Sequence, residues 1–385
     1  MANRRQKGTG SVWQDKSTKK WKGQIQIGYQ ANGNKKMKTV TGSSAKEVKT
    51  KLDKIKAGII TDTYFEKSNM TVPGIAHQIN NEKKQLNIIK TGTYNRNEQT
   101  IKIIEKSSIR NIPIQQVTER QLRNFYLEKI DYSNSVLKKC YEVINASYRR
   151  AIQLDIVQSN ININIPRPNS SKTTKKVKAL TVEQQKKVVN ALNTDNKEPY
   201  RTMLLLSLFT GMRMGEICAL QKNCIDLKNN IITVERTTTR DENERFVIGK
   251  TPKTHAGIRN IKIIQFVSDM LKEYILNEYE YNEQKLIFTK NKKLITPNQT
   301  NAYYKRLITR YRISETADNF NQHQLRHTYA TRSIESGMSA KVLQKKLGHT
   351  DIRVTMNVYA DVFAKFEDAE DDKLSLYLSK EKLLK

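Results

Sequence analysis

The chain contains little cysteine and no long apolar run. Its 385 residues include three cysteines, Cys140, Cys218 and Cys224, which are too few for a disulfide framework and lack the spacing of metal ligands. The longest apolar stretch, residues 203–209, is far shorter than the roughly 18 residues that a membrane span needs. Residues 1–5 lack the apolar core of a signal peptide. These absences predict a protein of a reducing, intracellular compartment.

Acidic residues are scarce relative to basic ones. The chain has 69 lysines and arginines against 38 aspartates and glutamates, a formal charge of +31. Such an excess predicts a polyanionic partner, of which nucleic acid is the commonest, although a ribosomal or membrane-surface protein is the alternative. A length of 385 residues predicts two or three domains.

Residues 1–65 show the pattern of a small sheet with one helix. Trp21 to Tyr29 alternates apolar and polar positions as a half-buried strand does, Asn32-Gly33 favours a hairpin turn, and residues 36–40 can return as the next strand. A helix is expected from a cap at Ser43 or Ser44 to about Ala57, before Gly58. Residues 1–38 hold ten basic residues and a single acid. This favours either a DNA-contacting sheet or a solvated basic surface, and the candidate contacts are Trp21, Lys22, Lys36 and Lys38.

Residues 66–165 have the spacing of a helical domain. Helices are expected near 71–89, 94–106, 118–129 and 133–154, and Thr118 and Gln121 form the pattern of a capping box. Cys140 falls on the apolar face of the last helix and is expected in the core. Residues 166–178 are a basic linker with two prolines, in which Lys172, Lys175 and Lys176 either contact phosphate or remain solvated.

The region from residue 179 to residue 385 carries the chemical motifs. His323 and Arg326 fall on one face of a helical turn, and the Leu347-Gly348-His349 motif and Tyr359 follow them. Upstream, Arg213 follows Thr210-Gly211 at the end of an apolar helix. Two arginines, two histidines and a hydroxyl nucleophile suit attack on a phosphodiester without a metal.

These motifs, in this order, resemble the tyrosine recombinases, the integrase family of phages and conjugative transposons. The resemblance implies an α+β, mostly helical fold with four parts. They are an N-terminal three-stranded sheet with a helix that binds arm-type DNA (1–65), a helical core-binding domain (66–165), a basic linker (166–178) and a mixed α/β catalytic domain with a C-terminal assembly segment (179–385). The assembly segment, residues 374–378, docks either on a neighbouring subunit or on its own domain.

The resemblance also assigns roles to individual residues. Tyr359 is the nucleophile that forms a 3′-phosphotyrosyl intermediate, and Arg213, Arg326 and His349 neutralise the phosphate. Lys253, with Lys250 as its rival, protonates the leaving 5′-oxygen from a hairpin tip at 249–257, and His323 assists proton transfer. Glu216 orients Arg213 or forms a structural ion pair with it, and Thr328 supports the site from behind. Neither a metal nor another cofactor nor ATP is expected.

The expected partners are double-stranded DNA at core and arm attachment sites, three further copies of the chain in a homotetramer, an excisionase and a host DNA-bending protein. No membrane is expected as a partner, and the expected location is the nucleoid in the cytoplasm of a bacterial host. A type IB topoisomerase is the nearest enzymatic alternative. A non-catalytic DNA-binding regulator derived from a recombinase is the alternative of another class.

Overall fold

A computed structural model describes residues 10–29, 32–61, 64–172, 178–249, 258–315, 317, 320–363, 375 and 378–381. The chain divides into two compact units, residues 1–173 and 174–385, each with its own core. About 52% of the chain is helical, which confirms the predicted mostly helical α+β fold. Within the described residues, no helix is both long and apolar enough to cross a membrane.

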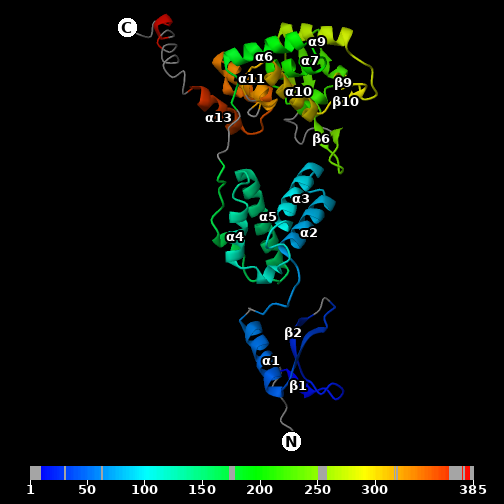
Figure 1. The fold of residues 1–385 in the computed structure, drawn as a ribbon, viewed down its shortest axis with the longest axis vertical. Helices are drawn as coiled ribbons and strands as arrows, with labels where there is room; N and C mark the ends of the chain where they lie inside the picture. The colour runs from blue at the N-terminus through cyan, green and yellow to red at the C-terminus, as the bar shows by residue number, and fades with distance from the viewer. Residues whose placement is uncertain are drawn as a thin grey trace. The chain divides into compact units, whose positions relative to one another are not determined.

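The first unit begins with a three-stranded antiparallel sheet covered on one face by a helix (Figure 1). The elements are β1 (Ser11–Gln14), β2 (Trp21–Tyr29), β3 (Lys35–Gly42) and α1 (Ala45–Ile60). Ile25 of the sheet packs with Val48 and Leu52 of α1 in a small core. The Ser44 side chain accepts a hydrogen bond from the Glu47 backbone, so the predicted cap at the start of α1 is confirmed.

The predicted end of this helix at Ala57 is wrong, since α1 continues through Gly58 to Ile60. Here glycine serves close packing rather than termination. The Tyr64 backbone N–H donates to the Gly58 carbonyl at 3.0 Å, and a Cβ on Gly58 would lie 3.1 Å from the Tyr64 Cβ.

The register of the sheet separates the residues predicted to contact DNA. Residues directly opposite each other in an antiparallel pair share a face. Lys38 lies opposite Ile25, whose side chain packs under α1, and Trp21 also packs against that core. Lys22 points to the other face, opposite Trp13, and is ion-paired with Asp15. The predicted contacts therefore do not form one surface.

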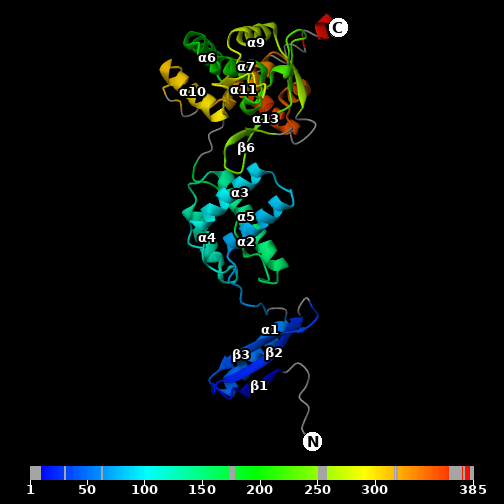
Figure 2. The same cartoon turned by 90° about the vertical axis from the view of Figure 1, so that its right-hand side faces the viewer.

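The rest of the first unit is a helical bundle (Figure 2). Its elements are α2 (Val72–Gln85), α3 (Thr91–Glu105), η1 (Ile114–Gln116), α4 (Glu119–Glu128), α5 (Asn134–Gln153) and η2 (Ile161–Asn164). All four predicted helices are present, although α2 ends earlier and α3 begins earlier than expected. The capping box of Thr118 and Gln121 forms, and Cys140 is 1% exposed in the core, as predicted.

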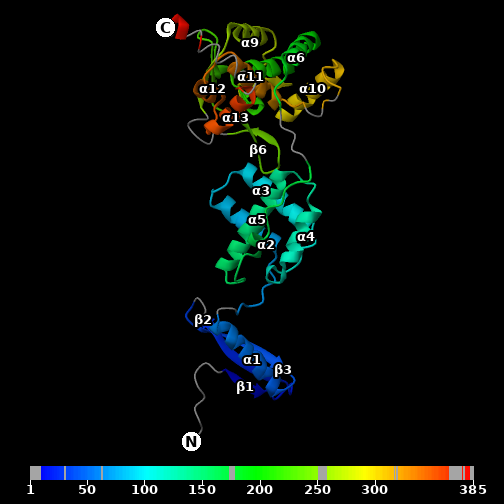
Figure 3. The ribbon, with the colours of Figure 1, turned by 90° about the vertical axis from the view of Figure 1, so that its left-hand side faces the viewer.

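The second unit, whose helices can be followed in Figure 3, packs around the buried helix α7 (Tyr200–Thr210), with small sheets at its side. Its helices are α6 (Val182–Asp195), α7 (Tyr200–Thr210), α8 (Met214–Cys218), η3 (Lys222–Cys224), α9 (Gln265–Asn277), α10 (Pro297–Arg310), α11 (His323–Glu335), α12 (Ala340–Leu347) and α13 (Ile352–Phe363). Its strands are β4 (Ile225–Asp226), β5 (Ile231–Val234), β6 (Thr238–Arg240), β7 (Phe246–Ile248), β8 (Arg259–Lys262), β9 (Thr289–Lys290) and β10 (Lys293–Leu294). The helix α7 is buried on nearly every side, as its apolar sequence predicted.

The strand pairing corrects the expected hairpin at residues 249–257. In the part of the chain that the structure describes, β7 pairs with β6, and β8 pairs with β5. The two strands that flank the segment are therefore not partners. Strands this short carry no signal in the sequence that selects their partner.

Candidate active site

The site begins where α7 ends. Gly211 takes a left-handed conformation, φ +69°, that closes the helix, and its amide donates to the Ser207 carbonyl. A Cβ on Gly211 would lie 2.5 Å from the Tyr329 ring, so only glycine fits this position. The chain then turns into α8, a short helix that ends at Cys218.

The carboxylate of Glu216 lies between two arginines. Its Oε1 accepts from Arg213 Nη1 at 2.9 Å and from Arg259 Nη1 at 3.1 Å, and its Oε2 accepts from Arg259 Nη2 at 2.7 Å. The Arg213 backbone N–H also donates to Oε2 at 2.9 Å. Burial alone raises the pKa of Glu216, but Arg259 and then Arg213 outweigh burial and lower it, so the carboxylate is ionised.

A third arginine, Arg326 of α11, is held by helix ends. Its Nη1 donates to the Gly211 carbonyl at 2.6 Å, and its Nη2 donates to the Leu347 carbonyl at 2.8 Å. Carbonyls at a helix C-terminus lack intrahelical partners and carry partial negative charge, so they orient a guanidinium well. Burial, followed by the Arg213 charge, lowers the pKa of Arg326 to about 9, which leaves it cationic at pH 7. Two of its five N–H donors are used in this way, and the others can serve a ligand.

The end of α12 brings the same elements together. Gly348 closes the helix with φ +66°, and its carbonyl accepts from Arg213 Nη2 at 3.4 Å. The Arg259 side chain packs against it, since a Cβ on Gly348 would lie 3.1 Å from Arg259 Cδ. The C-terminal ends of α7 and α12 thus converge on the arginine cluster of Arg213, Arg259 and Arg326.

Three histidines border this cluster. His349 Nδ1 lies 2.8 Å from the Thr355 hydroxyl of α13, and the His323 and His327 rings meet edge to face at 5.0 Å. Desolvation, followed by neighbouring positive charges, lowers the pKa of His323 and of His349 to about 4. Both imidazoles are therefore neutral at pH 7 and can each donate one hydrogen bond and accept another.

The cluster holds three guanidiniums against one carboxylate. Glu216 offsets one positive charge, and among the described side chains bonded to these arginines it is the one acid. Buried cations without a counter-ion are costly, so a pocket of this composition favours an anion. Planar guanidiniums match the paired oxygens of a phosphate.

Comparison with known proteins identifies the family of this part of the chain. Residues 178–365 match the phage integrase family and form a domain of that family.

Relatives of known name agree with this assignment. The integrase of Staphylococcus phage L54a is 27% identical over 71% of this chain and 84% of its own length. The transposase of transposon Tn916 from Enterococcus faecalis is 26% identical over 66% of this chain and 65% of its own length. The Tn1549 transposon integrase in complex with transposon right end DNA shares the fold, with a TM-score of 0.68, 24% identity, and coverage of 80% of this chain and 100% of that one.

The predicted family and enzyme class are thus confirmed, and this integrase-family chain is a tyrosine-type site-specific recombinase. The predicted residues Arg213, His323, Arg326 and His349 lie together around the ends of α7 and α12. Tyr359 lies on α13, the helix that also carries Thr355.

The other predicted residues are not among the described groups of this cluster. Lys253 and its rival Lys250 fall outside the described residues, as do Lys175, Lys176 and most of the C-terminal segment. Lys172 is exposed, and Lys36 forms an ion pair with Glu66.

Thr328 lies on another face of α11 and contacts the start of the second unit. Its hydroxyl accepts from the Leu180 N–H at 2.9 Å and donates to the Gln324 carbonyl at 2.8 Å. Gln324 Nε2 donates to the Lys178 carbonyl at 2.9 Å, and Arg332 Nη2 donates to the Leu180 carbonyl at 2.8 Å. This face of α11 therefore holds the segment that enters the integrase catalytic unit, here called the anchor segment, residues 178–180.

Arg259 was not predicted as a site residue, although the sequence contained a signal. Arg259 and Ile261 alternate along β8, Ile263 follows the strand, and all three are buried. A basic residue on the apolar face of a strand needs a buried acid as partner. Glu216 was the candidate acid, but it had been matched with Arg213 alone.

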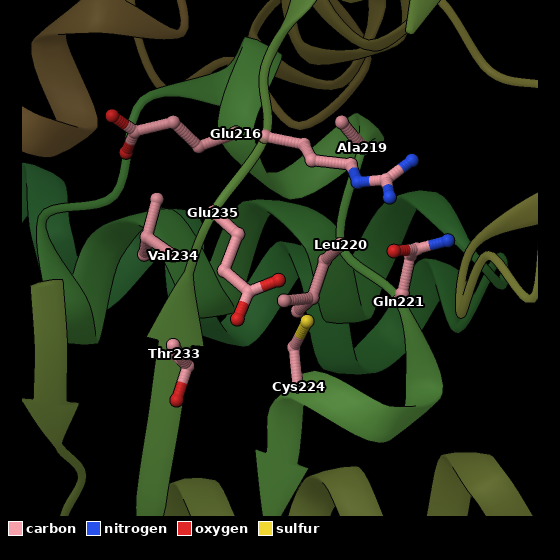
Figure 4. Close-up of a pocket in the computed structure, with 9 residues that line it drawn as sticks. Glu216, Ala219, Leu220, Gln221, Cys224, Thr233, Val234 and Glu235 are labelled. Atoms are coloured by element: carbon pink, nitrogen blue, oxygen red, sulfur yellow. The ribbon is translucent and has the colours of Figure 1, made fainter. Parts of the chain in front are cut away.

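A separate hollow adjoins Glu216 without reaching the cluster. It is lined by Glu216, Leu220, Cys224 and Glu235, among others (Figure 4). The Glu216 carboxylate points away from Cys224 and Glu235 in this view. The hollow therefore lies outside the arginine cluster.

Proposed function

We propose that this recombinase cuts and rejoins duplex DNA of a mobile element through Tyr359, with the arginine cluster binding the scissile phosphate. The observation that carries the proposal is the orientation of Arg213 and Arg326 by the C-terminal carbonyls of α7 and α12. Fixed donors stabilise a developing charge without reorganising during the reaction. Attack by Tyr359 Oη on phosphorus forms the phosphotyrosyl bond and breaks the bond between phosphorus and the 5′-oxygen.

Protons must move with this exchange. A tyrosine hydroxyl has a pKa near 10 and attacks poorly unless its anion is stabilised. We assign His323 to take up or return this proton and Lys253 to protonate the departing 5′-oxygen. A 5′-hydroxyl from a second duplex then attacks the phosphotyrosyl phosphorus in place of the original one. This attack releases Tyr359 and rejoins the strand through a Holliday junction. No step consumes ATP.

The Thr355 contact suggests the role of His349. If the Thr355 hydroxyl donates to Nδ1, the neutral ring carries its proton on Nε2 and can donate to a phosphate oxygen. Arrival of the phosphate anion raises the pKa of this histidine, because an opposite charge favours the protonated form. Binding the substrate thereby strengthens His349 as a donor.

The remaining parts supply DNA binding and assembly in this proposal. Residues 1–65 bind arm sites and residues 66–165 bind the core site. The linker of residues 166–178 crosses the DNA between the core-binding and catalytic domains, with its lysines near phosphate. Four copies assemble on DNA, with an excisionase and a host DNA-bending protein setting direction. The protein acts at the nucleoid in the cytoplasm of a bacterial host.

A suicide half-site tests the proposal. Full-length protein is incubated with half-site duplex DNA, from which cleavage releases a short fragment that bears the new 5′-hydroxyl. This fragment diffuses away, and the covalent adduct is measured after denaturation. We expect an adduct with the wild type, none with Tyr359→Phe, and equal DNA binding by both. Tyr281→Phe is the matched control, because Tyr281 is 70% exposed. DNA binding without an adduct would indicate a regulator, and relaxation of supercoils without strand exchange would indicate a topoisomerase.

A further inference from the structure

We infer that Arg259 is a positioning residue, which keeps Arg213 available for the scissile phosphate. This inference rests on the proposed function of Arg213. Arg259 is 8% exposed and lies at the start of β8, and its Nε, Nη1 and Nη2 are each engaged by the Lys346 carbonyl or the Glu216 carboxylate. It therefore acts through its neighbours rather than on DNA.

The first effect of Arg259 is electrostatic. Glu216 faces both Arg213 and Arg259, and the three groups together keep one net positive charge. Without Arg259, Glu216 and Arg213 would form a neutral pair, and the carboxylate would compete with the phosphate for the Arg213 guanidinium. Arg213 is 42% exposed in its side chain, whereas Arg259 is 5% exposed. Arg213 thus faces outward, whereas Arg259 offsets the charge of Glu216 from the interior of the protein.

The second effect is geometric. Arg259 Nε donates to the Lys346 carbonyl at 2.8 Å, and its side chain packs against Gly348. One side chain therefore joins three elements: β8, α8 and the end of α12. At that end of α12, the Gly348 carbonyl accepts a hydrogen bond from Arg213 Nη2, so Arg259 also steadies the contact that orients Arg213. Loss of these bonds would let the cluster shift, and a displacement of about 1 Å costs catalysis about 100-fold.

The test uses Arg259→Met, which keeps the length of the side chain and removes the charge and the fork. Full-length protein is assayed for DNA binding, melting temperature and the rate of adduct formation on the half-site. We expect normal binding and about a 100-fold slower adduct. Arg201→Met is the matched control, because Arg201 pairs with Glu198 at 3.1 Å at the opposite end of α7. It should lower stability similarly and leave the adduct rate near normal.

Two further measurements separate positioning from damage to the fold. In an Arg213→Ala background, Arg259→Met should slow adduct formation little more, because its effect passes through Arg213. A methylphosphonate at the scissile position removes the negative charge that Arg213 meets, so it should shrink the defect of Arg259→Met. Three results would overturn the inference. The defects of Arg213→Ala and Arg259→Met could multiply fully in the double variant, Arg259→Met could be equally slow on the phosphate and methylphosphonate substrates, or Arg259→Met could show no defect. Absence of any adduct from the wild type would instead overturn the proposed function.

Discussion

At the residue scale, the catalytic unit uses backbone carbonyls to orient cations. Arg326 bridges the Gly211 and Leu347 carbonyls, which belong to the ends of different helices. A planar fork can satisfy both acceptors and still present donors outward, whereas a lysine has one point charge on a flexible stem. The position therefore requires arginine rather than positive charge alone.

Arg326→Lys should slow adduct formation by about 10²- to 10³-fold while DNA binding persists, because one oriented oxyanion donor contributes that much. Single-turnover cleavage of the half-site measures the rate. Arg310→Lys is the control, since Arg310 forms a surface ion pair with Asp195 and is 62% exposed in its side chain. A near-normal rate for Arg326→Lys would remove this residue from the site.

The histidines should make the stability of the free protein depend on pH. Unfolded histidines bind a proton near pH 6.5, whereas folded His323 and His349 do so at about pH 4. Between these values the unfolded state holds more protons, so the stabilising contribution is complete above pH 6.5 and is lost as the pH falls toward 4. We expect His349→Gln to flatten this loss in melting temperatures measured at constant ionic strength.

His77 provides a control of opposite sign. Burial lowers its pKa, but the Glu105 and Glu98 carboxylates outweigh burial and raise it. Its contribution is complete below the unfolded value and is lost as the pH rises above it, so His77→Gln should change the slope above pH 6.5 and leave the loss between pH 6.5 and 4 unchanged. Equal pH profiles for wild type and His349→Gln would contradict the lowered pKa of His349.

At the element scale, helix ends determine where the site lies. Both α7 and α12 close with a left-handed glycine, and in each case the carbonyls freed at the end hold an arginine. A side chain on Gly211 would meet Tyr329 and Leu347, so the end of α7 is fixed both by backbone conformation and by packing. The closed ends of α7 and α12 thus hold Arg326 of α11, so that three helices contribute to the site.

Gly211→Ala should destabilise the second unit by more than the ~1 kcal/mol that a left-handed alanine costs, since its Cβ would also collide with the Tyr329 ring. Gly337→Ala separates the two causes, because Gly337 has φ +83° and nothing within 4 Å of the added Cβ. Urea denaturation of both variants gives the difference. Equal losses would show that Tyr329 moves aside at little cost.

The elements were predictable from sequence to different degrees. Apolar periodicity predicted α7 and α5 well, because a buried face repeats over several turns. The end of α1 was missed because the packing of Gly58 against Tyr64, not the local residue type, decides it. Arg213, Arg326 and His349 stood in ordered motifs, whereas Arg259 acts through Glu216, a partner 43 residues away in sequence, which periodicity does not reveal.

At the scale of the whole molecule, the basic residues are distributed over several regions, to which we assign different functions. In the N-terminal region, Lys22 lies on the free face of the sheet, whereas Lys38 lies on the face that α1 covers. The register therefore restricts which lysines can meet a flat duplex together. The sequence alone grouped both residues because they are close in number and alike in charge.

A fragment of residues 1–65 should fold alone and bind duplex DNA with strong salt dependence, because its lysines displace condensed counterions. Lys22→Ala should reduce the salt slope by about 0.9, the value of one phosphate contact. Lys38→Ala is the matched control and should change the slope less. Titrations at several salt concentrations measure the slopes, and salt-independent binding would show this region to be structural only.

The helix α11 has a consequence for how the sequence can change over generations. His323, Arg326 and His327 line the site, whereas Gln324, Thr328 and Arg332 hold the anchor segment. Its remaining inward positions fill the core with Leu325, Ala330 and Ile334. With every side of the helix engaged, few substitutions there are neutral. Variation among descendants of this chain should therefore accumulate at positions such as the exposed ones of α10, while α11 drifts slowly.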